Sequence, residues 1–144
     1  MAALVKLYND SNMAAINDYA HQLGFKGEPF GINNVGNTYD YMHYSFAEKD
    51  TTTKQQTYFS YTWGQHGIHI PYSIINLSYG TNSQAEFDAL VNELKALYFI
   101  IEEAKNDVLP DEHIYYYKGI YIVTRLSMVP NIAKYSITIG RRNW

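Results

Sequence analysis

The feature that most constrains the fold of this chain is an alternation of apolar and polar side chains with a period of two residues. Residues 39–46 (YDYMHYSF) and 56–63 (QTYFSYTW) alternate in this way, and β-branched and aromatic residues are frequent in residues 68–79, 113–117, 119–128 and 133–140. Successive side chains of a β-strand point to opposite faces, so this pattern is typical of strands with one buried face. The sequence therefore predicts strands in these segments, and polar loops at residues 31–38 and 48–54.

Two other segments have the spacing of amphipathic helices. In the first, Asp10 or Ser11 can cap the N-terminus, and Gly24 stands where glycine commonly ends a helix. In the second, Ser83 and Glu86 have the spacing of a capping box. We expect this second helix at about residues 84–106, with an apolar stripe made of Phe87, Leu90, Val91, Leu94, Tyr98 and Ile101.

The expected order of elements is therefore α-β-β-β-α-β-β-β. This order predicts an α+β protein with a mainly antiparallel sheet and two helices on one face. A length of 144 residues is typical of a single globular domain, so we assign residues 1–144 to one domain. We expect a cytoplasmic protein, because the chain has no cysteine and its longest apolar run, residues 96–101, is much too short to span a membrane.

The charge of the chain excludes some partners and is unevenly distributed. The net charge of −3 argues against a general nucleic-acid-binding protein, which would normally be basic. Residues 82–112 carry eight acids and two lysines, whereas residues 113–144 carry five cations and no acid. This polarity has two interpretations: a solvated acidic helix beside basic strands, or a face that meets a charged partner.

The strand alternation also predicts which side chains share the face away from the helices. If the helices cover Met42, Tyr44 and Phe46, the other face of the same strands carries phenols, hydroxyls and one imidazole. Those residues are Tyr39, Tyr41, His43 and Ser45 in one strand, and Tyr58, Ser60 and Thr62 in the next. Such a face is either an ordinary solvent-exposed surface, where Tyr and Thr are common, or a recognition surface, since tyrosine combines a rigid apolar ring with a polar tip.

The tyrosine-rich stretch HIYYYKGIYIVTRL, residues 113–126, divides between the two faces of a sheet. Tyr115 and Tyr117 have the same parity, and Tyr116 has the other. Beyond Gly119, Tyr121 and Val123 alternate with isoleucines. The stretch is therefore mainly sheet-forming sequence and contributes only some of its phenols to the outer face.

Motifs for catalysis and for metal binding are weak. His43 and Ser45 form one H-x-S element, and they are the weak catalytic candidates for a His-dependent phosphoesterase or hydrolase. Two-histidine phosphoesterases require a second such element, but His69 and His113 are not followed by the necessary hydroxyl residue. His66 and His69 fit a loop entering a strand better than a metal site. We predict no metal site and no cofactor.

Cationic residues offer a second kind of candidate site. Arg125, Arg141 and Arg142 are the only arginines, and Trp144 lies beside the last two. A hairpin around residues 129–131 would separate Arg125 from Arg141 by about 20 Å, too far for one compact anion site. The Arg141–Trp144 tail can nevertheless dock a partner by charge or by cation–π stacking.

These observations give one leading hypothesis and two alternatives for the function. The leading hypothesis is a non-catalytic binding protein that acts on a protein partner, of the inhibitor or immunity type and encoded by a phage or another mobile element. The first alternative is a nucleotide-binding protein in which tyrosines stack on the base and arginines hold the phosphate. The second is the His43–Ser45 hydrolase. A homodimer is a further candidate assembly, because an open sheet has edge strands that can pair.

Overall fold

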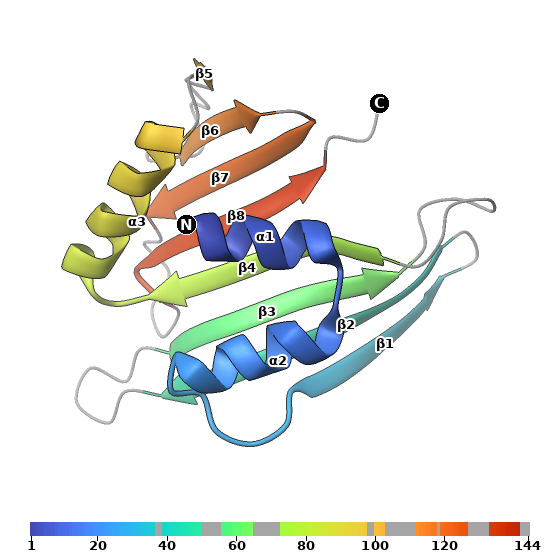
Figure 1. Ribbon diagram of the computed structural model, residues 1–144. Helices are drawn as coiled ribbons and strands as arrows, with labels where there is room; N and C mark the ends of the chain where they lie inside the picture. The colour runs from blue at the N-terminus through green and yellow to red at the C-terminus, as the bar shows by residue number, and fades with distance from the viewer. Residues whose placement is uncertain are drawn as a thin grey trace.

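The computed structural model describes residues 1–36, 39–49, 56–64, 73–97, 100–102, 112–117, 119–126 and 133–141. Eight antiparallel strands form one sheet in the order β1-β2-β3-β4-β8-β7-β6-β5 (Figure 1). Three helices lie on one face of this sheet (Figure 1). The helices are α1 (Ala2–Asp10), α2 (Met13–Gln22) and α3 (Gln84–Leu97); the strands are β1 (Phe30–Gly36), β2 (Tyr39–Lys49), β3 (Gln56–Gly64), β4 (Ser73–Thr81), β5 (Ile100–Glu102), β6 (Glu112–Tyr117), β7 (Ile120–Leu126) and β8 (Tyr135–Arg141).

The predicted α+β class, with helices on one face of an antiparallel sheet, is confirmed, but the elements differ at several places. Strand β1 occupies most of the predicted polar loop 31–38, because its backbone pairs with β2. In this pairing, Phe30 lies opposite Ser45 at one end and Gly36 lies opposite Tyr39 at the other. Helix α1 was not predicted. Helix α3 ends at Leu97 instead of about residue 106, and Ile101 of the predicted apolar stripe lies in β5, which pairs with β6. Tyr98 of that stripe lies outside the described residues. Strand β2 extends to Lys49, into the second predicted loop.

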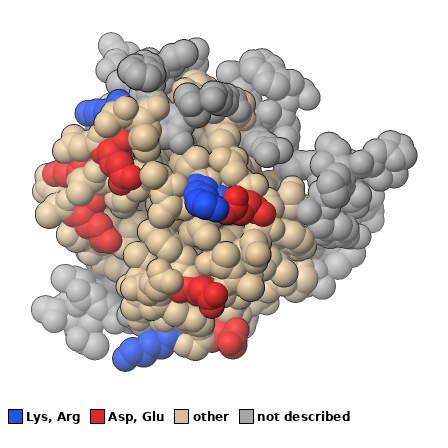
Figure 2. Space-filling view, in the orientation of Figure 1, with Lys and Arg blue, Asp and Glu red and all other residues tan. Residues whose placement is uncertain are grey.

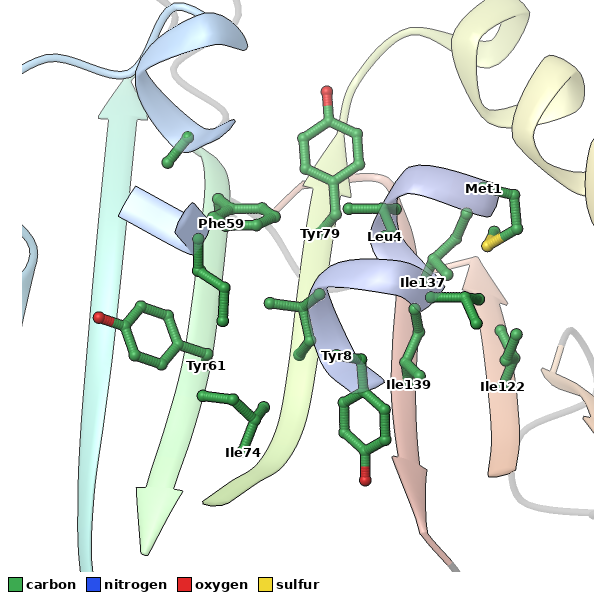
Figure 3. Close-up of a cluster of buried hydrophobic side chains, with 14 of the residues drawn as sticks. Met1, Leu4, Tyr8, Phe59, Tyr61, Ile74, Tyr79, Ile122, Ile137 and Ile139 are labelled. Carbon is green, nitrogen blue, oxygen red and sulfur yellow. The ribbon is translucent and has the colours of Figure 1, made fainter. Parts of the chain in front are cut away.

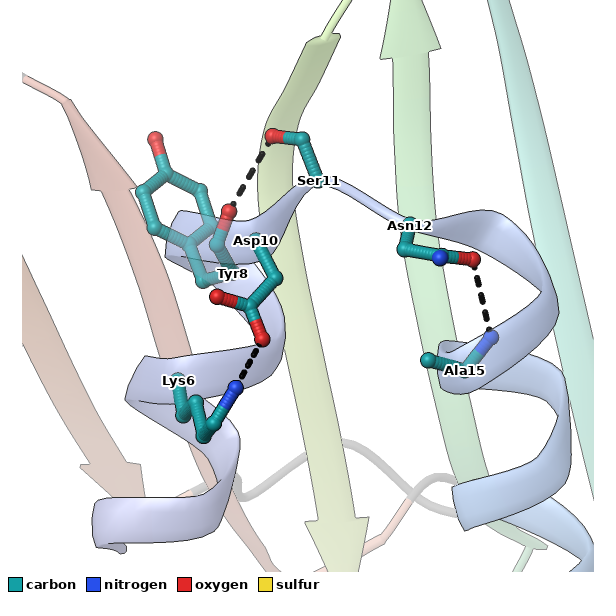
Figure 4. A network of polar contacts seen from close by, with 6 residues as sticks. All are labelled: Lys6, Tyr8, Asp10, Ser11, Asn12 and Ala15. Atoms are coloured by element: carbon teal, nitrogen blue, oxygen red, sulfur yellow. Dashed lines mark hydrogen bonds and ion pairs between the residues drawn. The ribbon is translucent and has the colours of Figure 1, made fainter.

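The start of α2 differs from the prediction in its capping residue (Figure 4). The N-cap is Asn12, whose side-chain oxygen accepts the Ala15 N–H at 3.1 Å. Asp10 instead pairs with Lys6, and Ser11 ends α1 in the left-handed conformation at φ 48°. Gly24 follows α2 with a φ of +97°, as the sequence predicted, because glycine tolerates this conformation without steric cost.

The hydrophobic core lies between the helices and the sheet (Figure 3). Helix α1 lies over the centre of the sheet, where its Leu4 and Tyr8 are buried beside Ile137 and Ile139 of β8. Helix α2 covers the β2–β3 side, where Phe59 takes part in a cluster of aromatic rings. Burial of these side chains is the main source of stability for such a fold, at roughly 25 cal/mol for each Å² of apolar surface.

Helix α3 is attached to the sheet by a carboxylate at its first turn. Ser83 caps the helix by accepting the Glu86 N–H at 3.2 Å, as the capping-box spacing predicted. In a complete capping box, the Glu86 carboxylate would also accept a hydrogen bond from the backbone N–H of Ser83, but it does not do so here. It accepts hydrogen bonds from Tyr79 at 2.7 Å and from Thr81 at 2.6 Å, and thereby joins α3 to β4.

The strand topology repeats itself about a pseudo-two-fold axis. Each half of the sheet is a helix followed by four consecutive antiparallel strands: α2 precedes β1–β4, and α3 precedes β5–β8. The halves join where β4 pairs with β8, and Ser78 lies opposite Thr138 at the centre of this pairing. None of the described helices is long and apolar enough to cross a membrane.

Buried phenols make the stability of this fold sensitive to alkaline pH. Burial, followed by the neighbouring Tyr44, raises the pKa of Tyr61 from 10.0 to about 12. As pH rises, Tyr61 therefore loses its proton at lower pH in the unfolded chain than in the folded one. Its contribution to the free energy of unfolding is fully present below pH 10.0 and is lost as pH rises toward about 12. We expect the free energy of unfolding to fall over this interval, and to fall less steeply in Tyr61→Phe, as measured by urea unfolding at several pH values.

If the free energy of unfolding fell equally steeply with pH in the wild type and in Tyr61→Phe, this assignment would be contradicted. Tyr116→Phe serves as the control, because Tyr116 is a partly exposed phenol of the opposite face.

Candidate functional site

The face of the sheet opposite the helices carries the candidate site, and we call it the open face. Its side chains alternate along each strand with the core residues, as strand geometry requires. Cross-strand pairing places the following described residues on it: His43, Ser45 and Ala47 of β2; Tyr58, Ser60 and Thr62 of β3; Asn76, Ser78 and Gly80 of β4; Ser136, Thr138 and Gly140 of β8; Tyr121, Val123 and Arg125 of β7; and Glu112, Ile114 and Tyr116 of β6.

A row of hydroxyl groups crosses the centre of the open face. Ser45, Ser60, Ser78 and Thr138 lie directly opposite one another on four adjacent strands. The hydroxyls of Ser78 and Thr138 are hydrogen-bonded at 2.9 Å across the junction of the two halves. At the β1 end of this row, Phe30 lies opposite Ser45 and is 72% exposed.

Two tyrosine rings lie over glycines on either side of this row. Tyr58 of β3 faces Gly80 of β4, and Tyr121 of β7 faces Gly140 of β8. A Cβ atom added to Gly80 would lie 2.6 Å from Cδ1 of Tyr58, and one added to Gly140 would lie 2.6 Å from Cζ of Tyr121. The glycines therefore leave the space that lets each ring lie against the neighbouring strand.

The pseudo-two-fold axis relates these two tyrosine–glycine pairs and also shows where the halves differ. In the first half, His43 of β2 lies opposite Thr62 of β3, and its Nδ1 is 3.2 Å from the threonine hydroxyl. The corresponding positions in the second half hold Glu112 and Arg125. These two side chains form an ion pair, with Nε of Arg125 2.9 Å from Oε2 of Glu112.

The ion pair borders a hollow in the open face. The hollow has a volume of about 340 Å³, and its lining consists of Tyr58, Glu112, Tyr121, Val123, Arg125, Ser136 and Thr138. It combines two phenol rings, two hydroxyls and a pair of opposite charges. Such a combination can hold a small polar group beside flat apolar surfaces.

Several predicted site residues come together on the open face, and others lie outside the described part. His43, Ser45, Tyr58, Ser60 and Arg125 all lie on this face. Tyr39 and Tyr41 belong to β2 and Arg141 ends β8, but their side chains are not among those described. Arg142, Trp144, His66 and His69 also lie outside the described residues.

The separation of Arg125 from Arg141 follows from the strand register. Arg125 lies opposite Ser136, and Arg141 lies opposite Ile120 at the far end of β7. The sequence did not predict the pairing of Glu112 with Arg125, because the predicted strand begins only at residue 113. Strand β6 begins at Glu112 and places it next to β7.

The acidic surface of α3 is the other candidate that the sequence singled out, and acidic side chains gather over this helix in Figure 2. Two of its carboxylates bind within the chain. Glu86 holds β4, and Glu93 accepts hydrogen bonds from the amino group of Met1 at 2.6 Å and the N–H of Ala2 at 2.9 Å. These contacts lower the pKa of Glu93. The helix therefore uses much of its negative charge for internal contacts.

A second cavity, of about 380 Å³, lies on the helix side between α3 and strands β6–β8. Its apolar wall includes Phe87, whose ring stacks on Tyr135 with centroids 4.9 Å apart. Thr124 and Tyr115 lie deeper, and Asp88, Lys95 and His113 border the opening. Its polar groups are of mixed charge and do not converge on one recognisable chemistry.

Comparison with known proteins gives no further assignment. No protein-family model, curated protein sequence or solved structure matches this chain.

The tyrosine–glycine pairs make a prediction about stability. In Gly80→Ala, the new methyl group would collide with the Tyr58 ring, so the ring must move away from the sheet. We expect a loss of about 1–3 kcal/mol in the free energy of unfolding, as for other overpacked sites. In the double variant Gly80→Ala/Tyr58→Ala, the loss should be smaller than the sum of the two single losses, because the collision is absent.

Urea unfolding measures these differences. Gly31→Ala serves as the control, because the nearest atom to its added Cβ, a ring carbon of Tyr44, lies at an ordinary distance of 3.4 Å. Additive losses at Gly80 and Tyr58 would show that the ring and the glycine are not coupled.

Proposed function

We propose that this chain is a non-catalytic binding protein that holds a protein partner on the open face of its sheet. The observation that carries the proposal is the composition of this face, in which tyrosines and short hydroxyl side chains surround two glycines. Tyrosine, serine, glycine and asparagine are also the residues that antibodies favour where they contact antigens. Tyrosine supplies a large contact area with few rotatable bonds, and hydroxyl groups adapt their hydrogen bonds to the partner.

The low charge of the open face supports the same proposal. Arg125 and Glu112 are its only charged side chains among those described, and they form an ion pair. The centres of protein interfaces are depleted of charged residues and enriched in aromatic ones. A face of this kind loses little hydration free energy on contact, because it has few charges to remove from water.

The rigidity of the face is a further argument. The Tyr58 and Tyr121 rings lie against glycines of adjacent strands, and the Ser78 and Thr138 hydroxyls bind each other. Side chains that are already ordered lose less conformational entropy when a partner binds. The open face therefore supports binding as a preorganised surface.

The catalytic alternative has less support. His43 and Ser45 share the open face, but Glu112 occupies the position related to His43 by the pseudo-two-fold axis. Among the described residues of this face, His43 is the only histidine. A two-histidine mechanism would need a second imidazole close enough to act as the acid.

A charged residue at the centre of the open face tests the proposal. We expect Ser78→Lys to weaken capture of the partner from a lysate of the source cells by at least about tenfold, because a lysine ammonium would be desolvated in the contact. Ala14→Lys is the matched control, since it places the same charge on the exposed side of α2. Capture is quantified by mass spectrometry of the proteins retained by each bait.

Thermal unfolding must first show that both variants are folded. Equal capture by wild type and Ser78→Lys, together with loss of capture in the α3 variant Asp88→Lys, would place the contact on α3 and overturn the proposal.

A further inference from the structure

We propose that β1 pairs with β1 of a second copy of this chain, antiparallel and centred on Asn33. The two copies then form one continuous sheet, and their two-fold axis is perpendicular to it. This inference is independent of the proposed function, because strands join in the plane of the sheet. Both open faces lie on the same side of the dimer and stay uncovered.

The described sheet has two edge strands, β1 and β5, which differ in length and composition (Figure 1). Strand β5 has three residues, one of them Glu102, and short or charged edge strands resist pairing with other chains. Strand β1 has seven residues, with no charged residue and no proline. No described strand lies beyond β1, so its backbone presents N–H and C=O groups on the side away from β2.

The ladder between β1 and β2 is regular, and a regular ladder keeps the outer edge of β1 regular too. All seven residues of β1 pair with β2 without a register shift, whereas the ladder between β3 and β4 contains one. Bulges twist an edge away from incoming strands. The regular ladder therefore makes β1 a suitable template for a further strand.

The sequence of β1 complements itself when two copies run antiparallel. With Asn33 opposite Asn33 of the second copy, all seven residues have a partner, and Phe30 lies opposite Gly36 of the second copy. No like charges meet, because the strand carries none. A register shifted by two residues would leave two residues of each strand unpaired.

The two tyrosine–glycine pairs of the sheet indicate what this register achieves. In each pair, an aromatic ring lies over a glycine directly opposite on the adjacent strand. Phe30 lies opposite Ser45 of β2 and is therefore on the open face, as the two tyrosines are. Its side chain is 72% exposed in the single chain, and the second copy brings Gly36, which has no side chain, directly opposite it. The dimer thus repeats an aromatic–glycine arrangement that the sheet already contains twice.

An extended segment of another protein would also satisfy the backbone of β1. Such a segment would need its own glycine at the position facing Phe30. A second copy supplies this glycine by symmetry, at both ends of the ladder at once. The composition of β1 therefore favours a second copy as the occupant of this edge.

Sedimentation equilibrium of the full chain tests the pairing. We expect the wild type to reach the mass of two chains at concentrations up to about 100 μM, and Asn33→Lys to weaken dimerisation at least about tenfold, because like charges then lie directly opposite each other. Asn33→Asp should have the same effect. An equimolar mixture of the two variants should restore the dimer, since lysine then faces aspartate. Ala14→Lys, which adds the same charge on the exposed side of α2, should remain dimeric.

Single cysteines test the register. The chain has no cysteine, so Asn33→Cys should give a disulfide-linked dimer on oxidation. Opposite residues of antiparallel strands have Cα atoms about 4.5–5.5 Å apart, which is within the reach of a disulfide. Val35→Cys is the matched control, because its two copies would lie four positions apart, about 13 Å along the strands, and should not be linked.

A wild type with the mass of one chain at all concentrations would overturn the inference, and so would a dimer unaffected by Asn33→Lys. If thermal unfolding shows that Asn33→Lys is not folded, the cysteine variants decide: a disulfide in Val35→Cys and none in Asn33→Cys would reject this register. A monomeric wild type whose partner capture is lost in Asn33→Lys would assign the edge to the partner instead of a second copy. Ser78→Lys should remain dimeric, so failure of the dimer and failure of the open face are distinguishable.

Discussion

The structure depends above all on the pairing of β4 with β8. These strands are far apart in the sequence, and their ladder runs from Asn76–Gly140 to Thr81–Tyr135. It joins two four-stranded halves that would otherwise each end in an unpaired edge at the centre of the molecule. The same ladder also carries the middle of the core, because Leu77, Ile137 and Ile139 are almost completely buried on its helix side.

The helices determine which face of the sheet is available for binding. Helix α1 lies over the β4–β8 junction, α2 covers the first half, and α3 is held by the Glu86 contacts to Tyr79 and Thr81 (Figure 1). Large apolar side chains therefore point toward the helices, and short or amphipathic ones point away. The Tyr, Ser, Thr and Gly residues of the open face follow from this division, and the proposed binding function depends on it.

Repetition of the same topology gives the open face two similar halves with one chemical difference. A tyrosine over a glycine occurs in each half, and a hydroxyl pair marks the axis between them. At the positions where the halves differ, a histidine–threonine hydrogen bond is replaced by a glutamate–arginine ion pair. Because an ion pair offers both a donor and an acceptor but little net charge, this difference changes hydrogen-bond specificity more than electrostatic attraction.

The sequence by itself determined the local features: the strand periodicity, the capping of α3 by Ser83, the glycine after α2, and the parity that put His43, Ser45 and Tyr58 on one face. These features depend on neighbours in the chain, so local rules are sufficient. Only the tertiary structure decided the remaining features. Strand β1 forms because its backbone finds a partner edge in β2, and α1 forms because Leu4 and Tyr8 are buried on the sheet. The pairing of Glu112 with Arg125 depends on the strand register, and so do the symmetry-related positions of Tyr58 and Tyr121. Long-range backbone pairing and the burial of one face of the sheet together determine this register.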